Sequence, residues 1–227
     1  VNIVALVCDQ GMDVIRNVYP RVGAETRPAA GANQHGSVEK PTLVVSQKGR
    51  SQIVLAVEID TLVAEAARVN GVIEFVPQVG DFVAADEPLF KLYGRAATIA
   101  EETLRECVAF GSERTMEQDS MFSFRILVDI ALKALSPAIN DPTTAVLALD
   151  QIHRLLRFVG KRRLHDEVVH DSAGQVRLLL RTPNWDDFVH IAFTEIRACG
   201  ANNVQIARRM RAMLENLVHS LPESRRP

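Results

Sequence analysis

Apolar residues recur at helical spacing along much of the chain, interrupted by turn-forming residues. This pattern predicts one helix at the beginning, a short helix in the first half, and a group of longer helices in the second half. The expected helices cover residues 2–19, 60–69, 97–110, 120–135, 143–160, 186–199 and 203–221.

Shorter apolar runs bounded by Gly, Asn, Asp and Pro predict strands. Five of them lie in the first half, at 42–45, 53–57, 72–76, 80–83 and 88–92, and a hairpin is expected near 164–181. Asp60 is expected to cap the short helix, and Asn70-Gly71 to end it with left-handed backbone geometry.

These elements predict an α+β protein, with a small β-rich domain resembling a barrel or hammerhead and then a mainly helical domain. The expected division is an N-terminal helix and linker at 1–40, the β-rich domain with its inserted helix at 41–95, and the helical domain with its hairpin at 96–227. Within the first segment, residues 21–40 are rich in Ala, Gly, Pro and polar side chains, which is typical of a linker or mobile loop.

The segment Gly80-Asp81-Phe82-Val83 resembles the half-barrel hairpin of biotinyl and lipoyl domains. In that family the lysine that carries the cofactor stands in an exposed hairpin. Lys91 lies between Phe90 and Leu92, a pattern that indicates a strand. We therefore interpret this region as a scaffold and expect no cofactor.

The helix expected at 120–135 is apolar on nearly all sides, which indicates a central position. Its polar side chains Arg125, Asp129 and Lys133 follow one another at steps of four, a spacing that allows ion pairs along the helix. The helix at 143–160 has matching apolar spacing, so we expect the two helices to pack antiparallel.

The loop between these two helices is unusually rich in residues with special backbone roles. Pro137 stops the first helix, Asp141 is a good N-cap for the second, and Pro142 suits its first position. Asn140 tolerates positive φ. One interpretation is that these roles are structural. The other is a polar pocket at a helix N-terminus, which favours an anion or a polar ligand group.

Seven residues form the candidate ligand site under the second interpretation. They are Arg125, Asp129, Ser136, Asn140, Asp141, Thr143 and Thr144.

The composition is that of a globular protein, with a formal net charge of −2 that gives no indication of nucleic-acid binding. Cys8, Cys107 and Cys199 are widely spaced, which argues against a disulfide framework or a metal site. His165 and His170 would point to opposite faces of a strand, so we expect no metal there.

No apolar run reaches the ~18–20 residues of a membrane span. The basic groups Lys161-Arg162-Arg163 and Arg208, Arg209 and Arg211 are interpreted as solvated faces, with anionic head groups as the alternative.

One motif resembles a known family. Glu113-Arg114, Asp119, Phe124-Arg125 and the run from Leu127 to Ala145, together with Gly80-Asp81-Phe82-Val83, resemble a bacterial family of predicted membrane proteins, domain of unknown function 2254. The resemblance implies transmembrane helices upstream and makes this chain, which begins with Val1, the soluble C-terminal portion of a longer protein. It also implies a bacterial inner-membrane location, with this portion on the cytoplasmic side. No reaction is implied.

Three hypotheses about function follow. The favoured one is a sensing, gating or assembly module whose Ser136–Thr144 loop holds a polar ligand or a partner segment. The second is an enzyme, for example a hydrolase, in which Asp129, Asn140 and Asp141 form a polar cluster. The third is a scaffold that holds membrane helices together and self-associates into a homo-oligomer. We favour a role without catalysis, and we expect the lipid membrane as a partner, with no metal and no nucleic acid.

Overall fold

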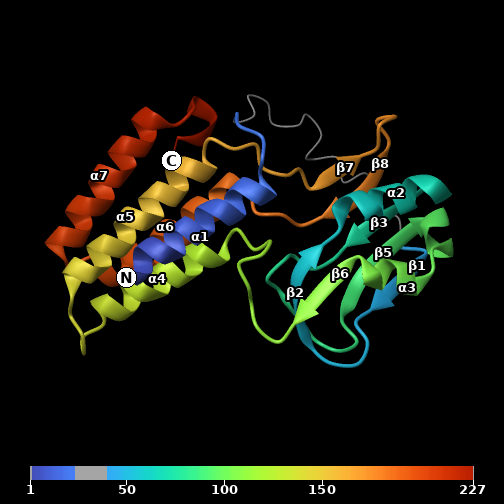
Figure 1. The fold of residues 1–227 in the computed structure, drawn as a ribbon, viewed down its shortest axis with the longest axis horizontal. Coiled ribbons are helices and arrows are strands. Elements are labelled where there is room, and N and C mark those ends of the chain that lie inside the picture. The colour runs from blue at the N-terminus through green and yellow to red at the C-terminus, as the bar shows by residue number, and fades with distance from the viewer. Residues whose placement is uncertain (1, 24–39, 227) are drawn as a thin grey trace. The chain divides into compact units, whose positions relative to one another are not determined.

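The computed structural model of the protein describes residues 2–23 and 40–226. Contacts group these residues into two compact units (Figure 1). The helical unit comprises the described residues of 1–27, 120–165 and 183–227, and the β-rich unit those of 28–119 and 166–182. Most of the linker expected at 21–40 lies outside the described residues. The α+β class expected from the sequence is confirmed.

Five long helices build the helical unit, and each was expected from the sequence. They are α1 (Ile3–Val18), α4 (Phe122–Leu135), α5 (Pro142–Val159), α6 (Trp185–Gly200) and α7 (Val204–Ser220), followed by the short 3-10 helix η2 (Glu223–Arg225). Helix α4 packs against α1, α5 and α6, which explains why its sequence is apolar on nearly all sides. The fully buried Phe124 lies against Phe188 of α6, with ring centroids 5.3 Å apart.

The contacts between helices give their directions. Asp9 of α1 faces Arg154 of α5, and Arg16, two turns further along, lies over Phe158. Helices α1 and α5 therefore run parallel. Arg209 in the second turn of α7 pairs with Asp150 in the middle of α5, while Leu221, just after α7, reaches Gly160 at the end of α5, so α7 runs the same way.

The starts of α1, α5 and α7 thus lie at one end of the bundle, together with the ends of α4 and α6. Asn2, Asp141 and Asn203 each accept a hydrogen bond from a backbone N–H of the first turn that they cap. We call this end, formed by the first two turns of α1, α5 and α7, the last turns of α4 and α6, and their connecting loops, the N-cap end. It contains the loop singled out in the sequence.

Two sheets form the β-rich unit. One has the order β1-β5-β3-β8-β7 and the other β4-β2-β6. The strands are β1 (Leu43–Ser46), β2 (Gln52–Val57), β3 (Gly71–Phe75), β4 (Phe82–Val83), β5 (Pro88–Gly94), β6 (Val108–Gly111), β7 (Val168–His170) and β8 (Val176–Leu180). Of the barrel-like or hammerhead-like domain expected from the sequence, only the closed barrel is wrong, because the described strands divide between these two open sheets and close no cylinder.

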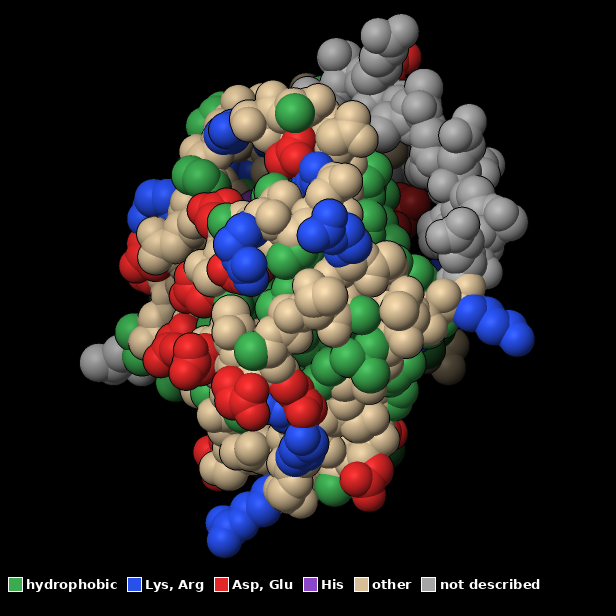
Figure 2. All heavy atoms as spheres, turned by 90° about the vertical axis from the view of Figure 1, so that its right-hand side faces the viewer, with side chains coloured by type: hydrophobic (Ala, Val, Ile, Leu, Met, Phe, Trp, Pro, Cys, Tyr) green, Lys and Arg blue, Asp and Glu red, His purple; other side chains and the backbone are tan. Residues whose placement is uncertain are grey.

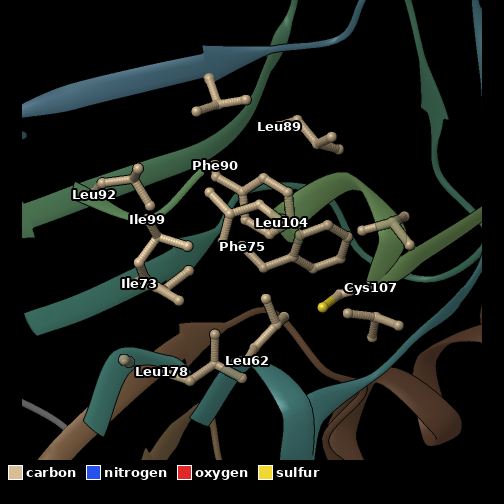
Figure 3. Close-up of a cluster of buried hydrophobic side chains, with 14 of the residues drawn as sticks. Leu62, Ile73, Phe75, Leu89, Phe90, Leu92, Ile99, Leu104, Cys107 and Leu178 are labelled. Carbon is tan, nitrogen blue, oxygen red and sulfur yellow. The ribbon is translucent and has the colours of Figure 1, made fainter. Parts of the chain in front are cut away.

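The hydrophobic core of the β-rich unit lies between strands and the helices α2 (Ile59–Val69) and α3 (Glu101–Glu106) (Figure 3). Phe75 of β3 and Phe90 of β5 lie at its centre, with ring centroids 5.3 Å apart. Leu62 of α2 and Leu104 of α3 are also fully buried. The two short helices are thus held by the apolar residues that they contribute to this core.

The helix expected at 97–110 is only partly correct, because α3 covers the middle of that range alone. The chain instead forms the 3-10 helix η1 (Arg95–Thr98), then α3, and then strand β6. Strand β6 pairs antiparallel with β2, with Val54 opposite Phe110. The strand forms despite the local helical spacing, because pairing with a segment some fifty positions earlier places Val54 and Phe110 side by side in a sheet that packs on the core.

The expected boundaries of α2 are partly correct. Asn70 ends the helix in the left-handed conformation, as expected, with φ at 55°. Asp60 is not the N-cap, because the helix begins at Ile59 and Glu58 precedes it without a side-chain capping bond. Gly71 is required for space: a Cβ there would lie 2.3 Å from the backbone nitrogen of Ala96.

The hairpin expected near 164–181 is present, and its strand β8 pairs parallel with β3, where Ile73 lies opposite Leu178. Residues about one hundred positions apart thus share one sheet within the β-rich unit. The division of the chain into folding domains at 1–40, 41–95 and 96–227 stays a prediction.

The three cysteines differ in burial. Burial raises the pKa of the Cys8 thiol to about 11 and also raises the pKa of Cys107, whereas Cys199 is exposed on α6. Because the thiolate is the reactive form, we expect one fast-reacting thiol per folded chain with a disulfide reagent at neutral pH, and three after unfolding in urea. A Cys199→Ser variant should lose the fast phase, and a second fast thiol in the folded wild type would contradict the buried positions.

Candidate functional site

The Ser136–Thr144 loop is ordered by its own backbone hydrogen bonds. The N–H groups of Ile139 and Asn140 donate to the carbonyl of Ser136 at 3.1 and 2.8 Å. The N–H of Asp141 donates to the carbonyl of Ala134 at 2.8 Å. Asn140 has the positive φ expected from the sequence, 47°, which turns the chain from α4 into α5.

Asp141 is the N-cap of α5, as predicted. Its carboxylate accepts hydrogen bonds from the Thr144 hydroxyl at 2.5 Å and the Thr144 N–H at 3.1 Å. These bonds from Thr144 hold the pKa of Asp141 below its usual value, with a further contribution from the N–H of Thr143. The backbone N–H of Thr144, in the first turn of α5, therefore has its acceptor within the loop.

The other loop side chains point to different partners. The Ser136 hydroxyl donates to the carbonyl of Lys133 at 2.7 Å and so binds the last turn of α4. The side chains of Ile139, Asn140 and Thr143 are exposed. The outermost part of the loop thus presents an apolar side chain beside an amide.

Arg125 and Asp129 form a separate cluster on α4. Arg125 pairs with Asp129 one turn later, as its spacing predicted, and also with Glu195 of α6, each at 2.5 Å. The bond from Glu195, ahead of that from Asp129, raises the pKa of Arg125, and Arg125 in turn lowers the pKa of Glu195. No local pattern indicated Glu195, because it lies seventy positions away on another helix.

The predicted site residues therefore fall into two groups. The backbone of Asp141 is hydrogen-bonded to Ala134 near the end of α4. Asp129 lies five residues before Ala134, which corresponds to about 7–8 Å along the helix axis. Its carboxylate is turned to Arg125, whereas the Asp141 carboxylate is turned to Thr144. Among the described contacts, none joins Asp129 to Asn140 or Asp141.

A further polar cluster lies in the β-rich unit. Asp119 has a side chain only 4% exposed, and Arg114, 31% exposed, donates to its Oδ2 through Nε and a terminal nitrogen at 2.8 and 2.6 Å. Gly80, with φ at 93°, passes so close that a Cβ would lie 2.4 Å from the same oxygen. All three residues belong to the segments that carry the family resemblance, but their grouping was not expected.

Other candidates have local partners. Lys91, the alternative carrier lysine, lies on β5 and pairs with Glu74 at 2.8 Å. Glu74 also accepts from the Tyr93 hydroxyl, whose pKa is raised to about 12, chiefly by desolvation and then by this bond. Among the described residues, no group of three or more His, Cys, Asp or Glu side chains is placed to hold a metal. Figure 2 shows acidic and basic side chains interspersed on the face that it draws.

Removing the Asp141 carboxylate is expected to destabilise α5. The Asp141→Ala variant loses an N-cap, so its Tm at neutral pH should fall by about 2–4 °C. Because the folded state lowers the pKa of Asp141, its contribution is complete above about pH 4 and is lost as the pH falls further. The difference in Tm between the two proteins should therefore shrink towards about pH 3, measured by circular dichroism.

Thr143→Ala is the matched control, because the Thr143 side chain is exposed beside the same cap. It should melt close to the wild type. A Tm difference for Asp141→Ala that is independent of pH would contradict the capping role of the ionised carboxylate.

Comparison with known proteins places the chain in a family. A family model described as Predicted membrane protein (DUF2254) matches residues 1–216. Uncharacterised proteins of Mycobacterium bovis and of two Mycobacterium tuberculosis strains are each 34% identical over 152 residues, which is 64% of this chain and 29% of theirs. The match thus spans less than a third of the length of these relatives. No solved structure matches the chain significantly.

The helices described here do not reach the combination of length and apolar character that crossing a membrane requires. The family match covers nearly the whole chain and includes both the Ser136–Thr144 loop and the Gly80, Arg114 and Asp119 cluster. The resemblance seen in the sequence is therefore confirmed: this chain belongs to the bacterial family of predicted membrane proteins known as domain of unknown function 2254.

Proposed function

We propose that this chain is an assembly module of a membrane-associated protein, and that its Ser136–Thr144 loop is the contact surface. The observation that carries the proposal is that the loop is both ordered and exposed. Its backbone is ordered by internal hydrogen bonds, and its outermost side chains, Ile139 and Asn140, are exposed. A preordered loop loses little conformational entropy on binding.

The chemistry of the loop favours a macromolecular partner over a small anion. The groups that would bind an anion at the start of α5, the N–H and hydroxyl of Thr144, already donate to Asp141. What the loop leaves exposed is an isoleucine side chain, an amide and the Thr143 side chain, a combination typical of protein and lipid contacts. Sensing or gating would use the same surface if a polar ligand displaced these bonds.

A bacterial inner-membrane location, with this chain on the cytoplasmic side, belongs to the same proposal and draws on the family description. The catalytic alternative receives no support from the contacts, since Asp129 is held by Arg125 and Asp141 by Thr144. Self-association into a homo-oligomer is one form that assembly can take, and the experiment below detects it.

The proposal is tested by a photo-crosslinking residue at position 139 in cells that produce the protein. We expect a discrete product, joined to protein or to lipid, which weakens when Asn140 is replaced by Ala. The control places the same residue at position 172, in the exposed turn between β7 and β8. Absence of any product at 139, or an equal yield at 172, would overturn the assembly role.

A further inference from the structure

We infer that the N-cap end of the helical unit is a docking surface for an anionic lipid membrane. The inference rests on the proposed function, because it names the partner of the Ser136–Thr144 loop and widens the contact to the residues around it. It is carried by three observations on the described residues: where exposed apolar side chains gather, where unpaired cations lie, and how the nearby carboxylates are occupied.

Exposed large apolar side chains of the helical unit concentrate at this end. Scattered examples are normal on any protein surface. Here, five of eight lie at the N-cap end, whereas the remaining three are Val22, Leu214 and Val218. The five are Ile3, Leu6, Ile139, Leu147 and Val204.

These five residues come from three separate parts of the chain. Ile3, Ile139 and Val204 are the most exposed, at 58%, 50% and 62%, and each lies at or beside the first turn of a helix. The parallel directions of α1, α5 and α7 bring the three helix starts to one end of the bundle (Figure 1). Apolar tips at several helix ends suit shallow insertion between lipid head groups.

Three basic side chains without an ion-pair partner among the described residues surround these tips. Lys133 lies in the last turn of α4 and Arg197 in the last turn of α6, while Arg208 lies in the second turn of α7; all three are exposed. Two other arginines of α7, Arg209 and Arg211, pair with Asp150 and Glu215.

The carboxylates near this end are already engaged. Asp9, in the second turn of α1, pairs with Arg154 at 3.4 Å, Asp141 accepts from Thr144, and Asp129 and Glu195 both accept from Arg125. Asp141 keeps its negative charge, because the groups of Thr144 are neutral, and Arg125 balances only one of Asp129 and Glu195. Set against Lys133, Arg197 and Arg208, these carboxylates leave a small positive balance at the N-cap end. Basic side chains near an anionic membrane surface each contribute a favourable attraction that salt weakens.

The same charge argues against a second copy of the chain as the occupant. Two N-cap ends placed face to face would bring Lys133, Arg197 and Arg208 against like charges, which disfavours the contact. An anionic lipid surface supplies both the apolar environment for Ile139 and Val204 and the opposite charge for the cations. Lipid is therefore the occupant that satisfies both features.

Cys199 provides a native reporter for the test. It is exposed in the last turn of α6, while Cys8 and Cys107 are buried, so an environment-sensitive fluorophore can be attached to it selectively. The labelled chain is mixed with vesicles of phosphatidylcholine alone or with about a third phosphatidylglycerol. We expect a blue shift and co-sedimentation with the anionic vesicles, both of which weaken as salt is raised.

Two double variants separate the contributions. Lys133→Gln with Arg208→Gln, and Ile139→Ser with Val204→Ser, should each lower the partition into anionic vesicles about tenfold or more. The matched control is Leu214→Ser with Val218→Ser, which removes exposed apolar side chains from later turns of α7. It should bind as the wild type does. Circular dichroism melting confirms that each variant is folded.

The outcomes separate this inference from the proposed function. If the folded wild type binds neither vesicle type, or if the control loses binding equally, the lipid inference is overturned. A protein crosslink at position 139 would then still support the assembly role. Concentration-dependent dimerisation that the N-cap variants abolish would replace lipid by a second copy and would also overturn the inference.

Discussion

The Asp119→Ala variant is expected to lower the free energy of unfolding by about 3 kcal/mol. Asp119 is almost fully buried, and its carboxylate is the partner of two Arg114 nitrogens. Removing it takes this carboxylate away from a guanidinium whose side chain is only 31% exposed. Because Arg114 retains some exposure to water, the loss should lie at the low end of the range for buried ion pairs.

Urea unfolding followed by circular dichroism measures this loss. The control is Glu102→Ala, which removes an exposed acidic side chain from the first turn of α3 and should change the stability by less than about 1 kcal/mol. Replacing both Asp119 and Arg114 with apolar residues should recover part of the loss, because no charge is then left unpaired. A loss below about 1 kcal/mol for Asp119→Ala would show that the pair is not effectively buried.

The close approach of Gly80 to this pair gives the family pattern a physical meaning. Gly80 combines positive φ with a position where a Cβ would meet the Asp119 carboxylate, so glycine is required on two grounds. The Gly-Asp turn before β4, Arg114 and Asp119 therefore form one structural unit of the β-rich part of the protein.

The second large effect is expected at Gly11, where α1 crosses α4. A Cβ at this position would lie 2.5 Å from the Ser123 hydroxyl and 2.6 Å from the Ser123 Cβ. Alanine within a helix is intrinsically better than glycine by about 0.5–1 kcal/mol. The clash outweighs this gain, because the Ser123 Cβ is fixed to the α4 backbone. We expect Gly11→Ala to lower the free energy of unfolding by about 2 kcal/mol.

A compensating change tests the steric cause. Ser123→Gly removes both atoms that the new Cβ would meet, so the double variant should be more stable than the sum of the single changes predicts. A coupling of more than about 1 kcal/mol in this double-mutant cycle is expected. Additive effects would mean that α1 shifts away from α4 on its own and that close packing of the two helices is not required.

The sequence correctly indicated features that depend on residues a few positions apart. The helices of the helical unit, the cap at Asp141, the positive φ at Asn140 and the Arg125–Asp129 pair all follow from local spacing. The end of the helix expected at 97–110 was wrong, because strand pairing with β2, a non-local interaction, prevails over helical spacing from Val108 onward.

The candidate site shows the same division. The roles of Asp141 and Thr144 could be read from the loop, since capping is a local interaction. The second partner of Arg125 could not, because Glu195 reaches it only when α4 and α6 pack together. The ligand-binding role of the seven candidate residues stays a proposal, and the experiments on the N-cap end address it.

By itself the sequence determined the helices, the turns, the caps and the family, because hydrophobic period and backbone preference act over a few residues. Only the tertiary structure decided which distant segments meet. It paired β8 with β3, placed Gly80 against Asp119, and brought the exposed side chains of three helix starts to one end of the bundle. Those contacts depend on how buried surfaces fit one another across long stretches of chain, and no local pattern specifies that fit.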